Sequence, residues 1–146
     1  MKPITKDENA PPIVKDMLSA SRSAGVGPMA AVAGAIAEYV GKDLLEFSRN
    51  VIIENGGDIF LSSENDVKVA VYAGDSPLSY HVNILGRKEK MPMGICTSSG
   101  TVGHSLSFGR ADAVCVVSQS AIIADASATA IGNLVKRKSD IAFALK

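Results

Sequence analysis

The sequence contains no tryptophan, only two cysteines and two histidines, and no net charge, and these shortages exclude several classes of protein. Cys96 and Cys115 lie in apolar, strand-like runs and match neither a zinc-ligand spacing nor a CxxC redox motif. We therefore interpret both as buried, reduced thiols. Fifteen basic residues balance fifteen acidic ones, so bulk charge gives no reason to expect nucleic acid or an anionic membrane as a partner.

Long apolar runs are missing as well. No run reaches the ~20 residues that span a bilayer, and Met1–Thr5 lacks the hydrophobic core of a signal peptide. We therefore expect a soluble, cytoplasmic protein that binds no membrane. At 146 residues the chain is long enough to bury a real core as one domain, residues 1–146.

Apolar periodicity predicts helices towards both ends of the chain and strands between them. Helical spacing covers Ile13–Ala24 and Pro28–Val40, and the helix of small residues around Asp125 follows near the C-terminus. A short helix is expected over Asp43–Phe47. Strands are expected around Cys96, around Cys115 and over four further segments: Val51–Ile53, Ile59–Leu61, Val67–Ala73 and Tyr80–Leu85. The connections are too short for parallel crossovers, so the pattern predicts an α+β fold with a mostly antiparallel sheet flanked by helices.

Glycines mark two places where a ligand is conceivable. Gly56 and Gly57 interrupt an apolar, strand-like run, which indicates either a bulge or a close backbone approach by another group. The segment Gly25–Ala30 fits a permissive dinucleotide fingerprint, but that motif requires a strand before it, and Ser19–Ala24 has the pattern of a helix end. A Rossmann site is therefore not expected. His81 is expected on a strand face, without a functional role.

Asp125 and Thr129 are the most conspicuous pair of polar residues. They stand four residues apart in a helix that is otherwise apolar on every side, so they share one face of a buried helix. A buried carboxylate needs a partner, a metal or a proton. One carboxylate and one hydroxyl form a hard-oxygen set suited to Mg²⁺ together with phosphate oxygens and water. The alternative is that Asp125 caps the start of its own helix.

His104 is the only candidate for a general base in this half of the chain. It follows the hydroxyl-rich segment Thr97–Thr101, and its pKa range suits removal of a proton from a hydroxyl group. The alternative is a histidine that is hydrogen-bonded within a turn. No third residue is placed to orient it, so a Ser-His-Asp triad is not predicted.

Three segments, in this order, resemble motifs of the ApbE family, the FAD:protein FMN transferases. Asn55–Ile59 is similar to the family's NxGGDI element, Thr97–Gly100 to its TSG turn and Ala124–Ala130 to its ADALATA helix. A wider resemblance, from about Ala10 onward, is to an uncharacterised family of ApbE relatives. The family's HxxDP element has no counterpart, and the segment at the position of KGxxxD, Pro28–Ala33, lacks its lysine and aspartate.

The resemblance implies that the protein binds FAD with Mg²⁺ and transfers FMN to an acceptor protein. Asp125 and Thr129 would ligate the metal, and His104 would activate the acceptor hydroxyl. The flavin nucleotide would be lined by two segments, namely Asn55, Gly56, Gly57 and Asp58 in the first and Thr97, Ser98, Ser99 and Gly100 in the second. The missing elements leave a second possibility, a protein that binds a flavin or another phosphate ligand without catalysis. Members of the related family extend further on both sides, which leaves open sheet edges here, and we expect a homo-oligomer.

Overall fold

The computed structural model describes residues 2–5, 7–103 and 107–146, so the predicted base His104 lies outside the described residues. The helical segments are α1 (Pro12–Ala24), η1 (Pro28–Ala31), α2 (Val32–Leu44), η2 (Lys88–Lys90), α3 (Ala121–Leu134), η3 (Lys138–Asp140) and α4 (Ile141–Ala144). The strands are β1 (Val51–Asn55), β2 (Asp58–Ser62), β3 (Val67–Ala70), β4 (Asn83–Gly86), β5 (Met93–Ser98) and β6 (Val114–Ser118). Every observed strand pairing is antiparallel, which confirms the predicted α+β fold.

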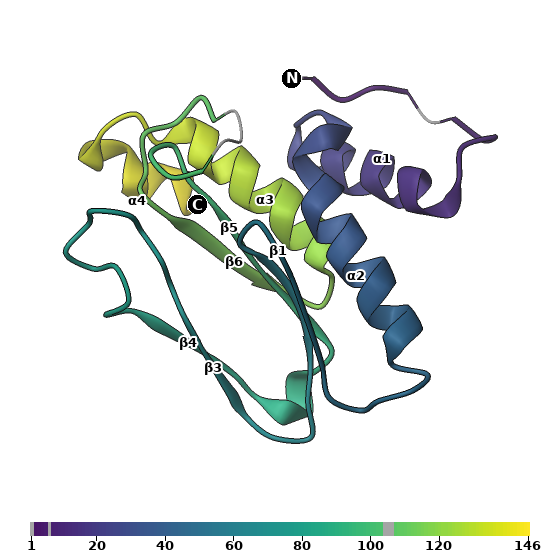
Figure 1. Ribbon diagram of the computed structural model, residues 1–146. Helices are drawn as coiled ribbons and strands as arrows, with labels where there is room; N and C mark the ends of the chain where they lie inside the picture. The colour runs from purple at the N-terminus through teal and green to yellow at the C-terminus, as the bar shows by residue number, and fades with distance from the viewer. Residues whose placement is uncertain (1, 6, 104–106) are drawn as a thin grey trace.

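A four-stranded sheet in the order β1-β2-β5-β6 forms the centre of the fold (Figure 1). Helices α2 and α3 pack on one of its faces, α1 packs on those two helices, and the two-stranded β3–β4 sheet lies across the other face. In the part of the chain that the structure describes, no single helix is long and apolar enough to cross a membrane. The segments Pro12–Ala24 and Pro28–Leu44 together have the required length and composition, but a bend of 104° separates them.

Alternating side chains of the central strands divide the core into two layers. In β2, Phe60 packs between the sheet and the helices, beside Cys96 of β5. Leu61 packs with Ile95 in the layer between this sheet and the β3–β4 sheet. This two-residue period is what a strand buried on both faces requires. Small residues allow α3 to lie close to the sheet, since a side-chain carbon at Gly94 would collide with the backbone of Ala121.

Helix ends follow local chemistry. Pro12 stands in the first turn of α1, where a missing N–H costs nothing, and Gly25 ends that helix in the left-handed conformation at φ 73°. The N-cap of α3 is Ser120, whose hydroxyl oxygen accepts a hydrogen bond from the Ile123 amide at 3.4 Å.

Four details of the predicted secondary structure were wrong. The helix expected over Asp43–Phe47 is the last turn of α2 followed by a non-helical turn. The strand expected over Val67–Ala73 ends at Ala70 because the chain then enters the turn that leads to β4. That turn includes Tyr80 and His81, so β4 begins only at Asn83 and His81 does not lie on a strand face. The fourth is the bulge considered at Gly56 and Gly57, which form a hairpin turn beside the candidate site.

Candidate functional site

A cavity of about 620 Å³ opens at the end of the four-stranded sheet where the β1–β2 turn and the end of β5 meet α3. We call it the sheet-end cavity. Eight of the ten described residues that the sequence singled out line it: Gly56, Gly57, Asp58, Thr97, Ser98, Ser99, Asp125 and Thr129. Segments about 40 and 70 residues apart in the chain thus converge on a single space.

Gly56 and Gly57 form the tight turn of a β-hairpin, not a bulge within one strand. Their φ angles are 64° and 99°, and Asn55 pairs with Asp58 across the turn. Two successive residues with positive φ connect a two-residue hairpin with the correct twist, and glycine reaches this conformation without steric cost. The amide of Gly57 donates to the Glu54 carboxylate at 2.6 Å, which fixes the turn at the rim of the cavity.

Two predicted contact residues do not line the sheet-end cavity. The Asn55 side chain donates to the carbonyl oxygen of Ala33 at 3.4 Å and so connects the hairpin turn to the start of α2. Gly100 donates its amide to the Ala111 carbonyl at 2.8 Å, and it packs so closely against Gly109 that a side-chain carbon would not fit. Both residues support the cavity from outside.

Asp58 is buried at the start of β2, with its side chain on the helix-covered face opposite Cys96. One carboxylate oxygen accepts a hydrogen bond from the Thr97 amide at 3.2 Å. Burial raises the pKa of Asp58 to about 6, although the hydrogen bonds from Cys96 and Thr97 oppose this shift.

Asp125 is also buried, and its carboxylate caps α2 rather than its own helix. Oδ2 accepts a hydrogen bond from the Gly34 amide at 2.9 Å, in the first turn of α2. The alternative of a cap at the start of α3 is therefore wrong, because Ser120 has that position. Burial, with the nearby charge of Asp58, raises the pKa of Asp125 to about 7.

Hydroxyl groups complete the polar part of the cavity. Thr129 lies one helical turn after Asp125 and lines the same cavity. The Ser99 hydroxyl oxygen accepts hydrogen bonds from the amides of Thr101 and Val102 at 3.1 and 2.9 Å, which closes the turn that follows β5. The hydroxyl of Thr97 donates to the Cys115 sulfur at 3.2 Å.

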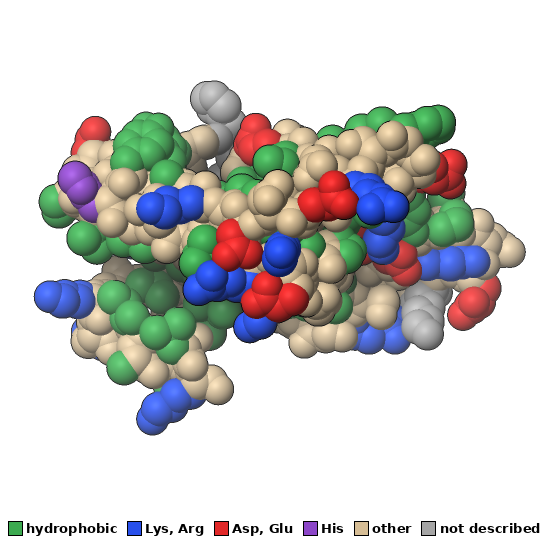
Figure 2. All heavy atoms as spheres, turned by 90° about the horizontal axis from the view of Figure 1, so that it is seen from below, with side chains coloured by type: hydrophobic (Ala, Val, Ile, Leu, Met, Phe, Trp, Pro, Cys, Tyr) green, Lys and Arg blue, Asp and Glu red, His purple; other side chains and the backbone are tan. Residues whose placement is uncertain are grey.

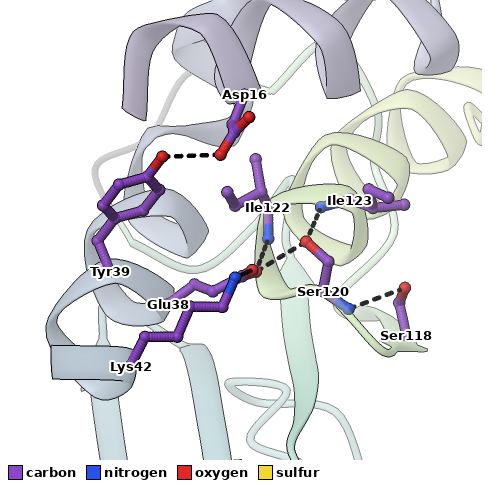
Figure 3. A network of polar contacts seen from close by, with 8 residues as sticks. All are labelled: Asp16, Glu38, Tyr39, Lys42, Ser118, Ser120, Ile122 and Ile123. Carbon is purple, nitrogen blue, oxygen red and sulfur yellow. Dashed lines mark hydrogen bonds and ion pairs between the residues drawn. The ribbon is translucent and has the colours of Figure 1, made fainter. Parts of the chain in front are cut away.

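Glu38 of α2 holds the start of α3 in place (Figure 3). Its Oε2 accepts hydrogen bonds from the Ser120 hydroxyl at 2.7 Å and the Ile122 amide at 3.2 Å, and Oε1 accepts one from Lys42 at 2.6 Å. Burial raises the pKa of Glu38, but the hydrogen bonds from Lys42, Ser120 and Ile122 outweigh it, so the net pKa lies below the ordinary value. Glu38 of α2 thus accepts an amide hydrogen bond at the start of α3, and Asp125 of α3 accepts one at the start of α2. We call this pair of contacts the exchange of caps.

Sequence reasoning missed Glu38 and the apolar wall of the cavity. A lone carboxylate after the small residues of α2 carries the same signal as Asp125 and would have identified Glu38. The wall formed by residues 69–72 at the end of β3 has no local signal, because only the tertiary fold brings it to the sheet end.

The described lining of the sheet-end cavity is acidic. The described residues there include three carboxylates, those of Glu54, Asp58 and Asp125, and no lysine or arginine. No ion pair joins Asp58 or Asp125 to a basic side chain of the described residues. Within that same part of the chain, no three His, Cys, Asp or Glu side chains cluster as a complete metal site. The described carboxylates could supply only part of the coordination shell of a cation.

The model of a protein family described as "AbpE bacteria" matches residues 1–144 of the chain. The chain belongs to this family. Among curated proteins, the chain is similar to the UPF0280 protein of Methanococcus aeolicus, with 54% identity over 134 residues, or 90% of this chain. It is also similar to the UPF0280 protein of Methanocaldococcus jannaschii, with 49% identity over 140 residues, or 94% of this chain. The aligned residues are 54% and 57% of those two relatives, so the chain spans just over half of their length.

Proposed function

We propose that the sheet-end cavity binds FAD together with Mg²⁺ and transfers FMN to a hydroxyl group of an acceptor protein. The observation that carries this proposal is the convergence of eight residues of the three ApbE-like motifs on one cavity. A cavity of about 620 Å³ is within the usual size range for a nucleotide-sized ligand.

Charge makes the metal a requirement of this proposal. A pyrophosphate group placed beside Asp58 and Asp125 would be repelled, because no described cavity residue is a lysine or arginine. The two buried carboxylates and the Thr129 hydroxyl fit a hard cation, since they offer oxygen atoms and have no cationic partner among the described residues. Asp125 and Thr129 would ligate Mg²⁺, with Asp58 close by, and phosphate oxygens and water would complete the shell. The metal would withdraw negative charge from the pyrophosphate.

In the proposed transfer, the acceptor hydroxyl oxygen bonds to the phosphorus of the FMN half of FAD, and the bond to AMP breaks. AMP leaves with the bridging oxygen, and the hydroxyl proton passes to a base. His104 remains the predicted base. The hairpin turn and Ser99 hold the walls of the cavity in place, so the ligand meets a rigid surface.

The test is a calorimetric titration of FAD with and without Mg²⁺ into the full chain and three variants. Asp125→Asn keeps an oxygen acceptor for the Gly34 amide and removes the charge, and Thr129→Val removes only the hydroxyl. Asp16→Asn is the matched control, because this exposed carboxylate contacts Tyr39 far from the sheet-end cavity. We expect Mg²⁺-dependent binding that the first two variants weaken at least tenfold and the control leaves unchanged.

A second assay separates binding from transfer. Protein-bound FMN and released AMP are measured with an acceptor peptide that contains threonine. Release of AMP that His104→Ala abolishes, with binding of FAD retained, supports transfer. Binding without AMP release leaves a flavin-binding protein, and equal binding in Mg²⁺ and in chelator refutes the metal-dependent site.

A further inference from the structure

A second cavity, of about 590 Å³, lies between the β3–β4 sheet and the C-terminal segment, and none of the ten predicted site residues that the structure describes lines it. We call it the C-terminal cavity. Figure 2 shows the molecule hollowed between two lobes, and hydrophobic side chains surround the hollow.

The walls of the C-terminal cavity are predominantly apolar and come from both sides of the hollow. Val71, Leu78, Val82 and Ile84 face it from β4 and the segment between β3 and β4. The opposite side is formed by Ala113, just before β6, by Cys115 in β6, and by Val135 and Ile141 in the C-terminal segment. An apolar body of moderate size is the group that such walls bind best.

Four basic residues are part of the lining of the C-terminal cavity. Arg110, Lys136, Arg137 and Lys138 all line it, whereas Asp112 is the single carboxylate there among the described residues. One oxygen of Asp112 accepts a hydrogen bond from the Thr101 hydroxyl at 2.9 Å. The excess of positive charge selects an anion.

Two of these cations are available for a ligand. Arg137 pairs with Asp140 at 3.2 Å, and the Lys136 ammonium donates to the Phe108 carbonyl. Within the described residues, the side chains of Arg110 and Lys138 make no hydrogen bond or ion pair. Arginine binds a carboxylate through two parallel N–H groups, which adds geometric selection to charge.

We propose that the C-terminal cavity binds an amphipathic monocarboxylate, with the hydrocarbon chain between the β3–β4 sheet and the C-terminal segment and the carboxylate at Arg110 and Lys138. The site is distinct from the sheet-end cavity in its ligand class, since the one selects an anion and the other a cation. The two cavities nevertheless share lining residues, Val71 and Cys115.

The shared cysteine supplies a readout that does not depend on activity. Cys115 is half-buried and faces both cavities, whereas Cys96 is fully buried in the core. Burial raises the pKa of the Cys115 thiol, so alkylation by a neutral maleimide is slow and sensitive to occupancy of the cavity. Peptide mass mapping reports this one residue.

The experiment uses decanoate as the probe and decanol as the uncharged match of equal chain length. Calorimetry measures the dissociation constant, and the rate of Cys115 alkylation locates the ligand. We expect decanoate to bind at least tenfold more tightly than decanol and to slow alkylation at least fivefold. Arg110→Gln should weaken decanoate about three- to tenfold, and Ala113→Phe, which fills the cavity without changing its charge, should abolish binding. Arg49→Gln, an exposed arginine outside the cavity, is the matched control.

Three results would overturn the proposal. Equal affinity for decanoate and decanol would show that the basic side chains do not contribute to binding. Protection of Cys115 that persists in Ala113→Phe places the ligand in the sheet-end cavity. A dimer in sedimentation equilibrium that Ala113→Phe dissociates, without decanoate binding, assigns the apolar walls to a second copy of the chain. Binding of FAD with Mg²⁺ is measured separately, so failure of one site does not count against the other.

Discussion

Asp125→Asn should make the protein more stable at pH 8 while it removes the proposed ligand site. The carboxylate of Asp125 is buried beside Asp58, and its pKa in the folded protein is about 7 against an ordinary value of 3.8. The folded protein therefore holds this proton more tightly than the unfolded chain does. Stability conferred by the protonated form is present below pH ~4 and is lost as the pH rises towards 7.

The magnitude follows from the shift in pKa. Each pKa unit corresponds to about 1.4 kcal/mol, so ionised Asp125 lowers the free energy of unfolding by up to about 4 kcal/mol at pH 8. The amide of asparagine binds the Gly34 amide less strongly than a carboxylate does, which offsets part of the gain. We expect a net gain of about 2 kcal/mol, or a rise in Tm of roughly 5–10 °C for a domain of this size.

Thermal unfolding followed by circular dichroism at pH 5, 6, 7 and 8, without Mg²⁺ or nucleotide, measures this effect. The difference in Tm between Asp125→Asn and the native chain should be largest at pH 8 and should shrink at pH 5, where the native carboxyl group is protonated too. Asp16→Asn controls for loss of an exposed carboxylate charge, and its amide oxygen can still accept the hydrogen bond from the Tyr39 hydroxyl. A variant that melts below the native chain at pH 8, or a gain that is the same at pH 5 and pH 8, contradicts the reasoning.

Three further predictions concern the Glu38 contacts, the hairpin turn and the two thiols. Glu38→Ala leaves two donors at the start of α3 without their acceptor, so urea denaturation should show a loss of about 2–3 kcal/mol, whereas Glu38→Gln should retain part of that stability. Gly57→Ala forces a side chain into a φ of 99° and should cost about 1–2 kcal/mol in the same assay, with an unchanged denaturant midpoint as the contrary result. In the native protein a thiol reagent should modify Cys115 slowly and Cys96 only on unfolding; equal rates would show that the core opens locally.

The sequence predicted the fold class because two short-range periods were clear. The alternation in strands and the helical spacing of small residues both depend on neighbours within a few positions. The element boundaries were wrong at the end of α2 and in the segment between β3 and β4, and the paired glycines form a turn in place of the expected bulge. Gly56 and Gly57 interrupt an apolar, strand-like pattern, which fits a bulge as well as a turn, and the pairing of β1 with β2 shows that it is a turn.

The candidate site was predictable in its members but not in their contacts. A carboxylate in an otherwise apolar helix identified Asp125, yet its hydrogen-bond partner Gly34 lies 91 residues earlier in the chain. Asn55 and Gly100 fit the motifs as well as their neighbours do, but they face away from the sheet-end cavity. Side-chain direction at a strand end depends on register and on packing against α2, which residue order alone does not specify.

The exchange of caps between α2 and α3 bears on how the protein folds. Glu38 satisfies amides at the start of α3 and Asp125 satisfies one at the start of α2, across sequence separations of more than 80 residues. Neither helix has a complete first turn until the other has docked, so the two are expected to become stable in the same cooperative step. Such long-range contacts slow folding, because the chain between them must close first. The sheet-end cavity consequently has no precursor in either half of the chain, and its acidic wall forms only when the two halves join.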